Sequence, residues 1–272
     1  MRIILTLVVL SFLSGVQSQI PVKYDVFAIK FAVYNAYFPD SGFAINPPVK
    51  DSARPTFMFW LIKGNNGKNI LVDAGFQRNS RAFDAGIIDY RRPDTALQLI
   101  GLKPEDISDI IITHPHSDHI NGIDLFPSAN LWMQRSDYSY FVGDNWKKEG
   151  DSIDVLKIVQ ANLKGKVHLI DGDSIEIFPG IRVFIGSKHT YESQYVLINT
   201  GKEKVIIASD NIWFYYNLNH MVSIPLTLDP AAYIKQMDRM KRLVNPKYII
   251  PGHDERVLQR FPKITDGIVQ IQ

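Results

Sequence analysis

The segment from Thr113 to His119, Thr-His-Pro-His-Ser-Asp-His, constrains the fold and chemistry of this chain more than any other. It contains four side chains of metal-ligating type: His114, His116, Asp118 and His119. Because side chains at i and i+2 of an extended segment point the same way, His114 and His116 can hold one ion together. Asp118 and His119 are adjacent, so they should diverge and serve a second ion. Two neighbouring ions can share and activate one water molecule, so the motif predicts a dinuclear metal centre rather than unrelated surface histidines.

Short apolar, β-branched runs precede the candidate ligands. The run from Asp109 to Thr113 has the pattern of a buried strand and leads directly into the histidine motif. A second run, 69–75, contains Asp73 near its end. Asp73 is either a hydrogen-bonding partner for a ligand histidine or a turn residue, and the spacing alone leaves both interpretations open. Since α/β sheets place their sites at the carboxyl ends of strands, these runs predict the location of the site.

Three residues further along the chain repeat this arrangement. His189, Asp210 and His253 follow the apolar runs 181–186, 205–208 and 248–252, respectively. A buried carboxylate without a partner is costly, so Asp210 calls for a cation beside it. Two other histidines do not fit the pattern. His168 lies within a strand-like run and His220 in an aromatic-rich stretch, and both are predicted to be structural.

Five motifs in this order, LVDAG, THPHSDH, SKHTYES, IIASDN and PGHD, resemble those of the metallo-β-lactamase superfamily. The resemblance implies an α/β fold, the αββα four-layer sandwich, with a dinuclear site on one edge. It also implies which residues bind each ion. His114, His116 and His189 would hold one metal, Asp118, His119 and His253 the other, and Asp210 would bridge them.

The N-terminus predicts export. Met1-Arg2 is followed by an apolar segment, 3–13, and then by Val16 and Ser18, which fit a signal-peptidase site. Residues 1–18 are therefore expected to be a cleavable signal peptide, and 19–272 a single hydrolase domain that is secreted or periplasmic. The chain has no cysteine for a lipid anchor or a disulfide, so no stable membrane anchor is expected. Its net charge of +2 is too small to indicate nucleic-acid binding, so no nucleic-acid partner is expected.

The sequence also predicts three helices. Residues 93–100 read as a helix, and another should continue from Ile123 onward after the metal loop. The clearest is 229–243, which Asp229 should cap and in which Pro230 occupies the first turn. A line of apolar residues should face the core from this helix: Ala232, Met237, Met240 and Val244.

The resemblance also narrows the substrate. The β-lactam-hydrolysing members usually lack the bridging aspartate, and glyoxalase II members carry a C-terminal helical region that the short stretch after His253 does not provide. PGHD followed by Phe261-Pro262 is similar to the N-acyl homoserine lactonase group. We therefore expect a small-molecule lactone substrate whose ring is opened, which would quench quorum signals. The alternatives are another ester, thioester or β-lactam hydrolase of the superfamily, or a non-catalytic metal-binding protein.

One position departs from the lactonase pattern. The best-known lactonases carry a tyrosine three residues after the bridging aspartate, where this chain has Trp213. Tyr215 or Tyr216 would have to replace that phenol, although aromatic packing is the favoured interpretation of both. Several aromatic side chains are candidates for the wall of an acyl pocket: Tyr34, Tyr37, Phe38, Trp213, Phe214, Tyr215 and Tyr216.

The predicted mechanism assigns Asp118 the catalytic role of carrying a proton to the leaving alkoxide. The cofactors would be two divalent metal ions. Zinc is expected for a ligand set of nitrogen and oxygen without thiolate, and manganese, iron and cobalt fit the same ligands.

Overall fold

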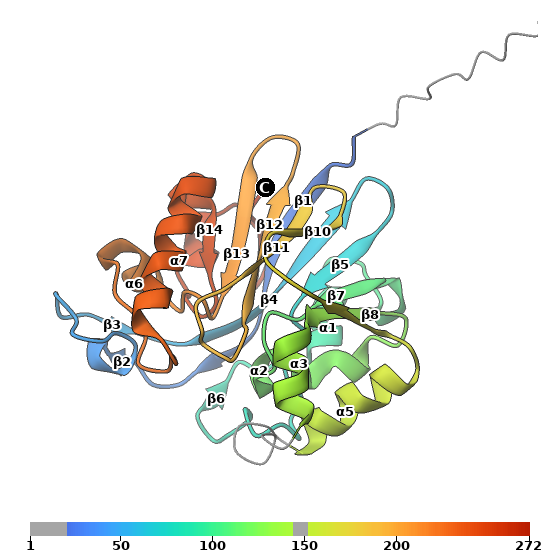
Figure 1. Ribbon diagram of the computed structural model, residues 1–272, viewed down its shortest axis with the longest axis horizontal. Helices are drawn as coiled ribbons and strands as arrows, with labels where there is room; N and C mark the ends of the chain where they lie inside the picture. The colour runs from blue at the N-terminus through green and yellow to red at the C-terminus, as the bar shows by residue number, and fades with distance from the viewer. Residues whose placement is uncertain (1–20, 144–151) are drawn as a thin grey trace, which may run out of the picture.

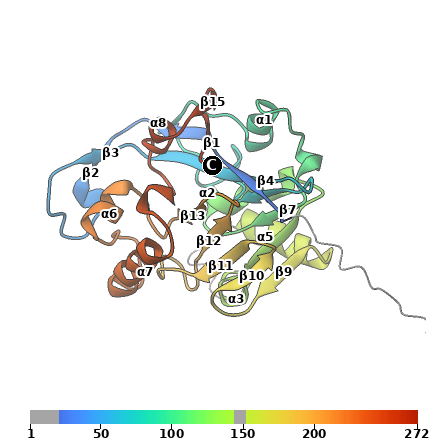
Figure 2. The ribbon, with the colours of Figure 1, turned by 90° about the horizontal axis from the view of Figure 1, so that it is seen from above.

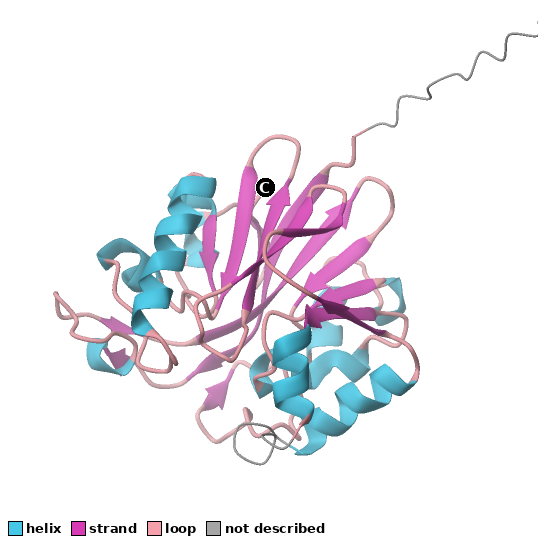
Figure 3. Cartoon of the chain, in the orientation of Figure 1, coloured by secondary structure: helices cyan, strands magenta, loops and turns pink. Residues whose placement is uncertain are grey.

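The computed structural model describes residues 21–143 and 152–272. The predicted signal peptide lies outside the described residues, and its cleavage stays a prediction. Two β-sheets pack face to face, and helices cover the outer face of each (Figures 1 and 3). The predicted αββα sandwich is therefore confirmed. None of the helices in the described ranges combines the length and apolarity that crossing a membrane requires.

The larger sheet has the strand order β15-β16-β1-β4-β5-β7-β8-β9, and β6 pairs with β1 at its side. From β5 to β9 the neighbours on this path run parallel, so their carboxyl ends meet at one edge. The strands are β1 (Tyr24–Tyr34), β4 (Thr56–Gly64), β5 (Asn69–Val72), β6 (Ile87–Ile88), β7 (Asp109–Ile111), β8 (Asn130–Gln134), β9 (Val167–Ile170), β15 (Lys263–Thr265) and β16 (Ile268–Gln270).

The smaller sheet has the order β10-β11-β12-β13-β14, and its last pair, β13 with β14, is parallel. A short pair, β2 with β3, stands apart from both sheets. The strands are β10 (Ile175–Phe178), β11 (Ile181–Ile185), β12 (Gln194–Asn199), β13 (Lys204–Ser209), β14 (Ile249–Pro251), β2 (Phe38–Pro39) and β3 (Ser52–Ala53).

Helices α6 and α7 lie together at one side of the molecule, as the view from above shows (Figure 2). The α-helices are α1 (Pro93–Gln98), α2 (Ser117–Ile120), α3 (Arg135–Val142), α5 (Ser152–Leu163), α6 (Tyr215–His220), α7 (Pro230–Leu243) and α8 (Val257–Arg260). The described chain also contains four 3-10 turns: η1 (Asp40–Gly42), η2 (Pro104–Asp106), η3 (Asn121–Leu125) and η4 (Pro246–Tyr248).

Two hydrophobic clusters hold these layers together. One lies between the sheets and under α7, and it includes Trp60 and Val183 from opposite sheets and Met237 of α7. The other lies between the larger sheet and its helices, and it includes Leu71 of β5 and Ile158 of α5. Burial of apolar surface on both faces explains why the central strands read as continuous apolar runs in the sequence.

The helix predictions had different outcomes. Helix α7 is confirmed, with the Asp229 carboxylate accepting hydrogen bonds from two backbone N–H groups of the first turn. On its inner face Met237 and Met240 are buried as predicted, whereas Tyr233 is buried and Ala232 is only half-buried.

Helix α1 begins at Pro93 as expected but already ends at Gln98. The helix predicted from Ile123 onward is wrong. The 3-10 turn η3 ends at Leu125, and the chain then enters strand β8. Pro127 lies two residues after that turn. Proline restricts the residue before it to extended conformations, which is incompatible with a continuing helix.

Candidate metal centre

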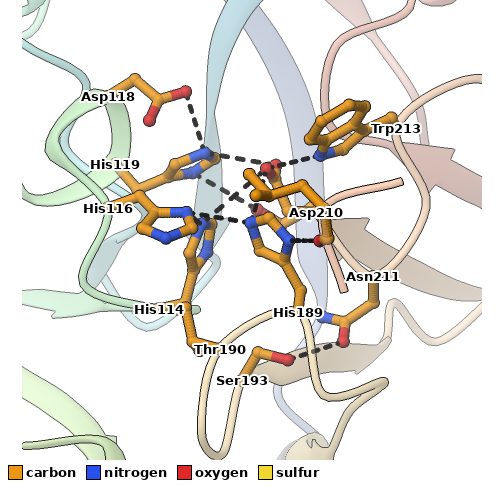
Figure 4. A network of polar contacts seen from close by, with 12 residues as sticks. His114, His116, Asp118, His119, His189, Thr190, Ser193, Asp210, Asn211 and Trp213 are labelled. Carbon is orange, nitrogen blue, oxygen red and sulfur yellow. Dashed lines mark hydrogen bonds and ion pairs between the residues drawn. The ribbon is translucent and has the colours of Figure 1, made fainter. Parts of the chain in front are cut away.

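The seven predicted ligand residues meet at the edge where the carboxyl ends of β7, β13 and β14 lie. They form two groups, and within each group the potential ligand atoms lie within 4.8 Å of one another. Figure 4 shows most of these side chains pointing toward a common centre. The first group is His114, His116, His189 and Asp210, and the second is Asp118, His119 and His253.

The histidine motif supplies both groups because its backbone changes conformation within it. His116 is extended, and residues 117–120 wind into the helical turn α2. The expectation that Asp118 and His119 diverge is wrong. In the helical turn the Asp118 Oδ2 atom lies 3.2 Å from His119 Nε2, and both side chains face the same group.

Asp210 stands between the two groups. Its Oδ2 lies 3.2 Å from His189 Nε2, on the first side. Its Oδ1 lies 2.9 Å from His253 Nε2 and 3.2 Å from His119 Nε2, on the second side. One carboxylate thus presents an oxygen to each group, the geometry expected of a residue that bridges two ions.

The backbone also approaches Asp210 closely. A Cβ atom added at Gly252 would lie 2.8 Å from Asp210 Oδ1. Glycine in the PGHD motif therefore makes room for the carboxylate beside His253.

The ring nitrogens of the first group converge on one another, as the ligands of one cation do. The Nδ1 atom of His116 lies 3.1 Å from His114 Nε2 and 2.9 Å from His189 Nε2. The other nitrogen of His189, Nδ1, lies 2.7 Å from the Leu226 carbonyl oxygen, so it carries the proton and Nε2 is a lone-pair donor.

Where Asp210 faces the second group, its Oδ1 atom and the Nε2 atom of His119 are both buried and make no hydrogen bond, although they lie 3.2 Å apart. Two buried atoms that approach without hydrogen-bond geometry are suited to share a metal ion. The residues present therefore fit two divalent ions.

Asp73 holds His119 from behind. Its Oδ2 lies 2.8 Å from His119 Nδ1 and also accepts hydrogen bonds from the Thr113 and Ser209 hydroxyls. Asp73 has a left-handed backbone with φ of 62°, which costs free energy for a residue other than glycine. Of the two interpretations left open by the sequence, the structure supports the hydrogen-bonding partner of a ligand histidine.

The turn that carries His189 is held mainly by backbone contacts and by Asn211. Asn211 Oδ1 accepts hydrogen bonds from the Ser187 backbone and from the Ser193 hydroxyl, on either side of the histidine (Figure 4). Because Asn211 adjoins Asp210, this amide fixes the His189 turn relative to the Asp210 carboxylate.

Protonation differs between the two groups. Burial and the neighbouring His119 hold the pKa of His114 well below its usual range, and burial lowers that of His116 to about 3. Burial also opposes charge on His119, but Asp118 and Asp210 outweigh it and hold its pKa well above the usual value.

For His253 and the two carboxylates, Asp210 and Asp118, the neighbouring charges also outweigh the effect of burial on the pKa. The pKa of His253 is raised, since Asp210 overcomes the effect of burial. Burial alone would raise the pKa of Asp210, but His253 and His119 hold it well below its usual range. Burial would likewise raise the pKa of Asp118, but His119 lowers it to about 2. Both carboxylates are therefore ionised and available to a metal.

An apolar cavity of about 190 Å³ opens onto this centre. Besides ligand residues, its lining is aromatic and aliphatic: Phe38, Pro55, Phe57, Trp213, Phe214 and Leu226. Of the aromatic residues proposed from the sequence, Phe38, Trp213 and Phe214 therefore line the cavity. Tyr37 is 56 % exposed and carries Arg54 over its ring instead.

The tyrosines after Asp210 do not line this cavity. Tyr215 is buried beneath the Arg260 guanidinium, and the Tyr216 hydroxyl donates to the carbonyl oxygen of Val49. Trp213 occupies the predicted tyrosine position and donates its indole N–H to Asp210 Oδ2 at 2.7 Å. The favoured packing interpretation of both tyrosines agrees with these contacts.

The remaining histidines lie in structural positions. His168 stacks on Trp132 with ring centroids 4.3 Å apart, and His220 packs against Tyr216. Neither belongs to the ligand groups found among the described residues.

The sequence did not identify Leu226 or Asp137 as part of the site. Leu226 supplies its carbonyl to His189, and Asp137 accepts hydrogen bonds from Thr190 and from the Glu192 backbone in the His189 turn. Both belong to segments without a metal-type motif, so no spacing could have revealed them.

An αββα sandwich with a histidine- and aspartate-rich centre at its edge defines a class of metal-binding folds. The model of the metallo-beta-lactamase superfamily matches residues 58–253. The chain therefore belongs to this superfamily, and its fold is the metallo-beta-lactamase fold.

Within the superfamily, the chain is similar to N-acyl homoserine lactonases. It is 27% identical over 175 residues to the enzyme of Bacillus cereus, a match that covers 62% of this chain and 66% of that protein. The chain thus spans slightly less than two thirds of the length of this curated relative.

Solved structures of lactonases share the fold. A variant of AiiA from Bacillus thuringiensis with N-decanoyl-L-homoserine bound has a TM-score of 0.70 at 21% identity, covering 90% of this chain and 98% of that one. The dizinc quorum-quenching lactonase AidC has a TM-score of 0.62 at 18% identity, covering 85% and 87%.

Proposed function

We propose that this protein is an exported metal-dependent hydrolase that opens the ring of N-acyl homoserine lactones and so quenches quorum signals. The observation that carries the proposal is Asp210, which presents one oxygen to each of two ligand groups at the floor of an apolar cavity. The similarity to lactonases supports the substrate class. The cavity is lined by side chains suited to an acyl chain, whose burial there is favourable.

The chain's own residues can bind and orient the reacting groups. Two bound divalent ions, taken to be zinc, would supply Lewis-acid activation of water and of the ester carbonyl. His114, His116 and His189 would hold one ion and Asp118, His119 and His253 the other, with Asp210 between them. Phe57 and Phe214 exclude water from the apolar side of the cavity.

Asp118 is placed to move the proton. Its side chain is 21% exposed, whereas that of His119 is only 2% exposed, so its carboxylate is accessible from the cavity it lines. It is ionised before reaction and can take a proton from the attacking water and deliver it to the leaving alkoxide. The Trp213 N–H is already donated to Asp210, so the indole orients the carboxylate and does not transfer a proton.

The test is a pH-stat assay, which follows the acid released, on a panel of lactones, β-lactams, thioesters and phosphodiesters. N-acyl homoserine lactones should be hydrolysed faster than any β-lactam, with activity lost on chelation and restored by a divalent metal. Faster turnover of a β-lactam or phosphodiester than of every lactone would assign the centre to another branch of the superfamily. N-terminal sequencing of exported protein should find Gln19, and an intact Met1 would contradict export by cleavage.

A further inference from the structure

The metal centre lies between two cavities of different chemistry. The first is the apolar cavity described above. The second, of about 370 Å³, is lined by the cationic Arg81 and by Ser117 in addition to Ala82. Three residues line both cavities: His116, Asp118 and Leu226. Two of these are predicted ligands, so Leu226 is the shared residue that the metal centre itself does not require as a side chain.

The side chain of Leu226 has no structural role that accounts for its position. It is 55% exposed and belongs to none of the hydrophobic clusters in the described chain. An apolar side chain that stays half in water at the mouth of a site gains free energy when an apolar ligand covers it. Its position between an apolar cavity and a second cavity lined by Arg81 therefore points to contact with substrate.

The backbone around Leu226 is fixed to the metal centre. Its carbonyl oxygen accepts the hydrogen bond from His189 Nδ1, at 2.7 Å. On its C-terminal side, the Thr227 hydroxyl donates to the Lys188 carbonyl at 3.1 Å, and the Leu228 N–H donates to the same oxygen at 2.8 Å. The side chain is thus held at a defined place relative to the ligands, while the contact to His189 does not depend on it.

We propose that Leu226 is a specificity-determining residue that separates the two cavities and directs the apolar substituent of an ester substrate into the aromatic one. This inference rests on the proposed ester hydrolysis at the metal centre. The acyl chain would bind in the apolar cavity, beside Phe57 and Trp213. The polar part of the substrate would bind in the second cavity, beside Arg81.

The experiment compares Leu226→Ala with Leu228→Ala in the metal-loaded full chain. Leu228 is a matched control because it lies on the same loop, is 64% exposed and lines neither cavity. Kinetics are measured with p-nitrophenyl esters from butyrate to decanoate, and lactones are assayed in parallel. The KM of the wild type should fall with acyl length. Leu226→Ala should flatten this dependence and raise the KM for decanoate by about tenfold, with kcat and the metal content unchanged.

One further variant, together with the Leu228→Ala control, decides the outcome. Leu226→Met, which conserves volume, should restore most of the acyl-length preference, while Leu228→Ala should equal the wild type. The inference is overturned if Leu226→Ala keeps the wild-type dependence on acyl length, if the wild type shows none, or if Leu226→Ala loses metal. A wild type that hydrolyses the nitrophenyl esters but no lactone would instead contradict the proposed function, and the ester series would still decide the role of Leu226.

Discussion

The two ligand groups share one carboxylate but are held in place by different means. In the first, the His189 turn is fixed by backbone contacts to Leu226 and Leu228 and by the Asn211 amide. In the second, the Nδ1 atom of His119 is held by side chains, the buried Asp73 carboxylate at 2.8 Å and the Ser209 hydroxyl at 3.4 Å. The first group should therefore be robust toward substitution, and the second should be sensitive to the loss of one partner.

The groups also differ in charge. In the first group, burial lowers the pKa values of His114 and His116 and keeps them neutral, whereas in the second group His119 and His253 have raised pKa values because carboxylates surround them. Since a ligand histidine must be neutral, an ion entering the second group has to displace protons from His119 and His253, whereas His114 and His116 are already neutral. The two sites of one centre thus differ in what opposes metal binding.

The largest effect is expected from Asp210→Ala, which removes the residue common to both groups. Metal content should fall from two ions to at most one, and activity should fall by more than about a hundredfold, beyond what loss of an outer partner costs. Metal analysis of purified protein provides the measurement. His168→Ala, which alters only the stacking on Trp132, is the control and should keep both ions. A pair of ions retained in active Asp210→Ala would refute the bridging role.

Asp118→Asn should separate proton transfer from metal binding. The amide cannot take up a proton at neutral pH, so turnover should fall by about 10²–10⁴-fold. The first ion should bind as in the wild type, because Asp118 belongs to the second group. Steady-state kinetics and chelator competition on the same sample measure the two effects. A kcat close to that of the wild type would exclude Asp118 as the proton carrier.

The third prediction compares two buried carboxylates, one behind each group. Asp73→Asn removes the charge that contacts His119 and should lower the affinity of the second ion by about 10–100-fold. Asp137→Asn is the matched substitution behind the first group. It touches Thr190 and Glu192 rather than a ligand, so it should change metal affinity by less than about tenfold. Equal losses in the two variants would show that the proposed difference between the groups is absent.

The sequence predicted the centre better than its surroundings, for a physical reason. Metal ligands need particular residue types at the ends of strands, so His114, Asp210 and His253 can be recognised from residue type and spacing. Asp73 was recognisable only in part, because a carboxylate before a glycine also suits a turn. Backbone carbonyls such as that of Leu226 are present in every residue, and their use depends on how distant loops meet. The wrong helix from Ile123 has a similar origin, since Pro127 and a parallel strand partner overrode the local pattern.

The smallest expected effect is on the pH dependence of the free energy of unfolding. Measuring it tests whether Asp137 is buried as a neutral group. Burial raises the pKa of Asp137 from 3.8 to about 6. Between these values the folded protein binds a proton that the unfolded chain has released, so stability should fall as pH rises from about 4 to 6 and then level off. Two pH units correspond to about 3 kcal/mol in the free energy of unfolding. Asp137→Asn cannot ionise, so this part of the pH dependence should disappear.

Urea unfolding of the metal-free protein at a series of pH values between 4 and 7 measures this difference. Other groups titrate in the same range, but they are common to both proteins, and the difference between wild type and Asp137→Asn isolates the single carboxyl group. Asp266→Asn, at an exposed position paired only with Lys263, should run parallel to the wild type. If the Asp137→Asn curve is parallel as well, Asp137 is ionised in the folded protein. The first group would then rest on a buried charge, as the second does on Asp73, and this part of the contrast between the two groups would disappear.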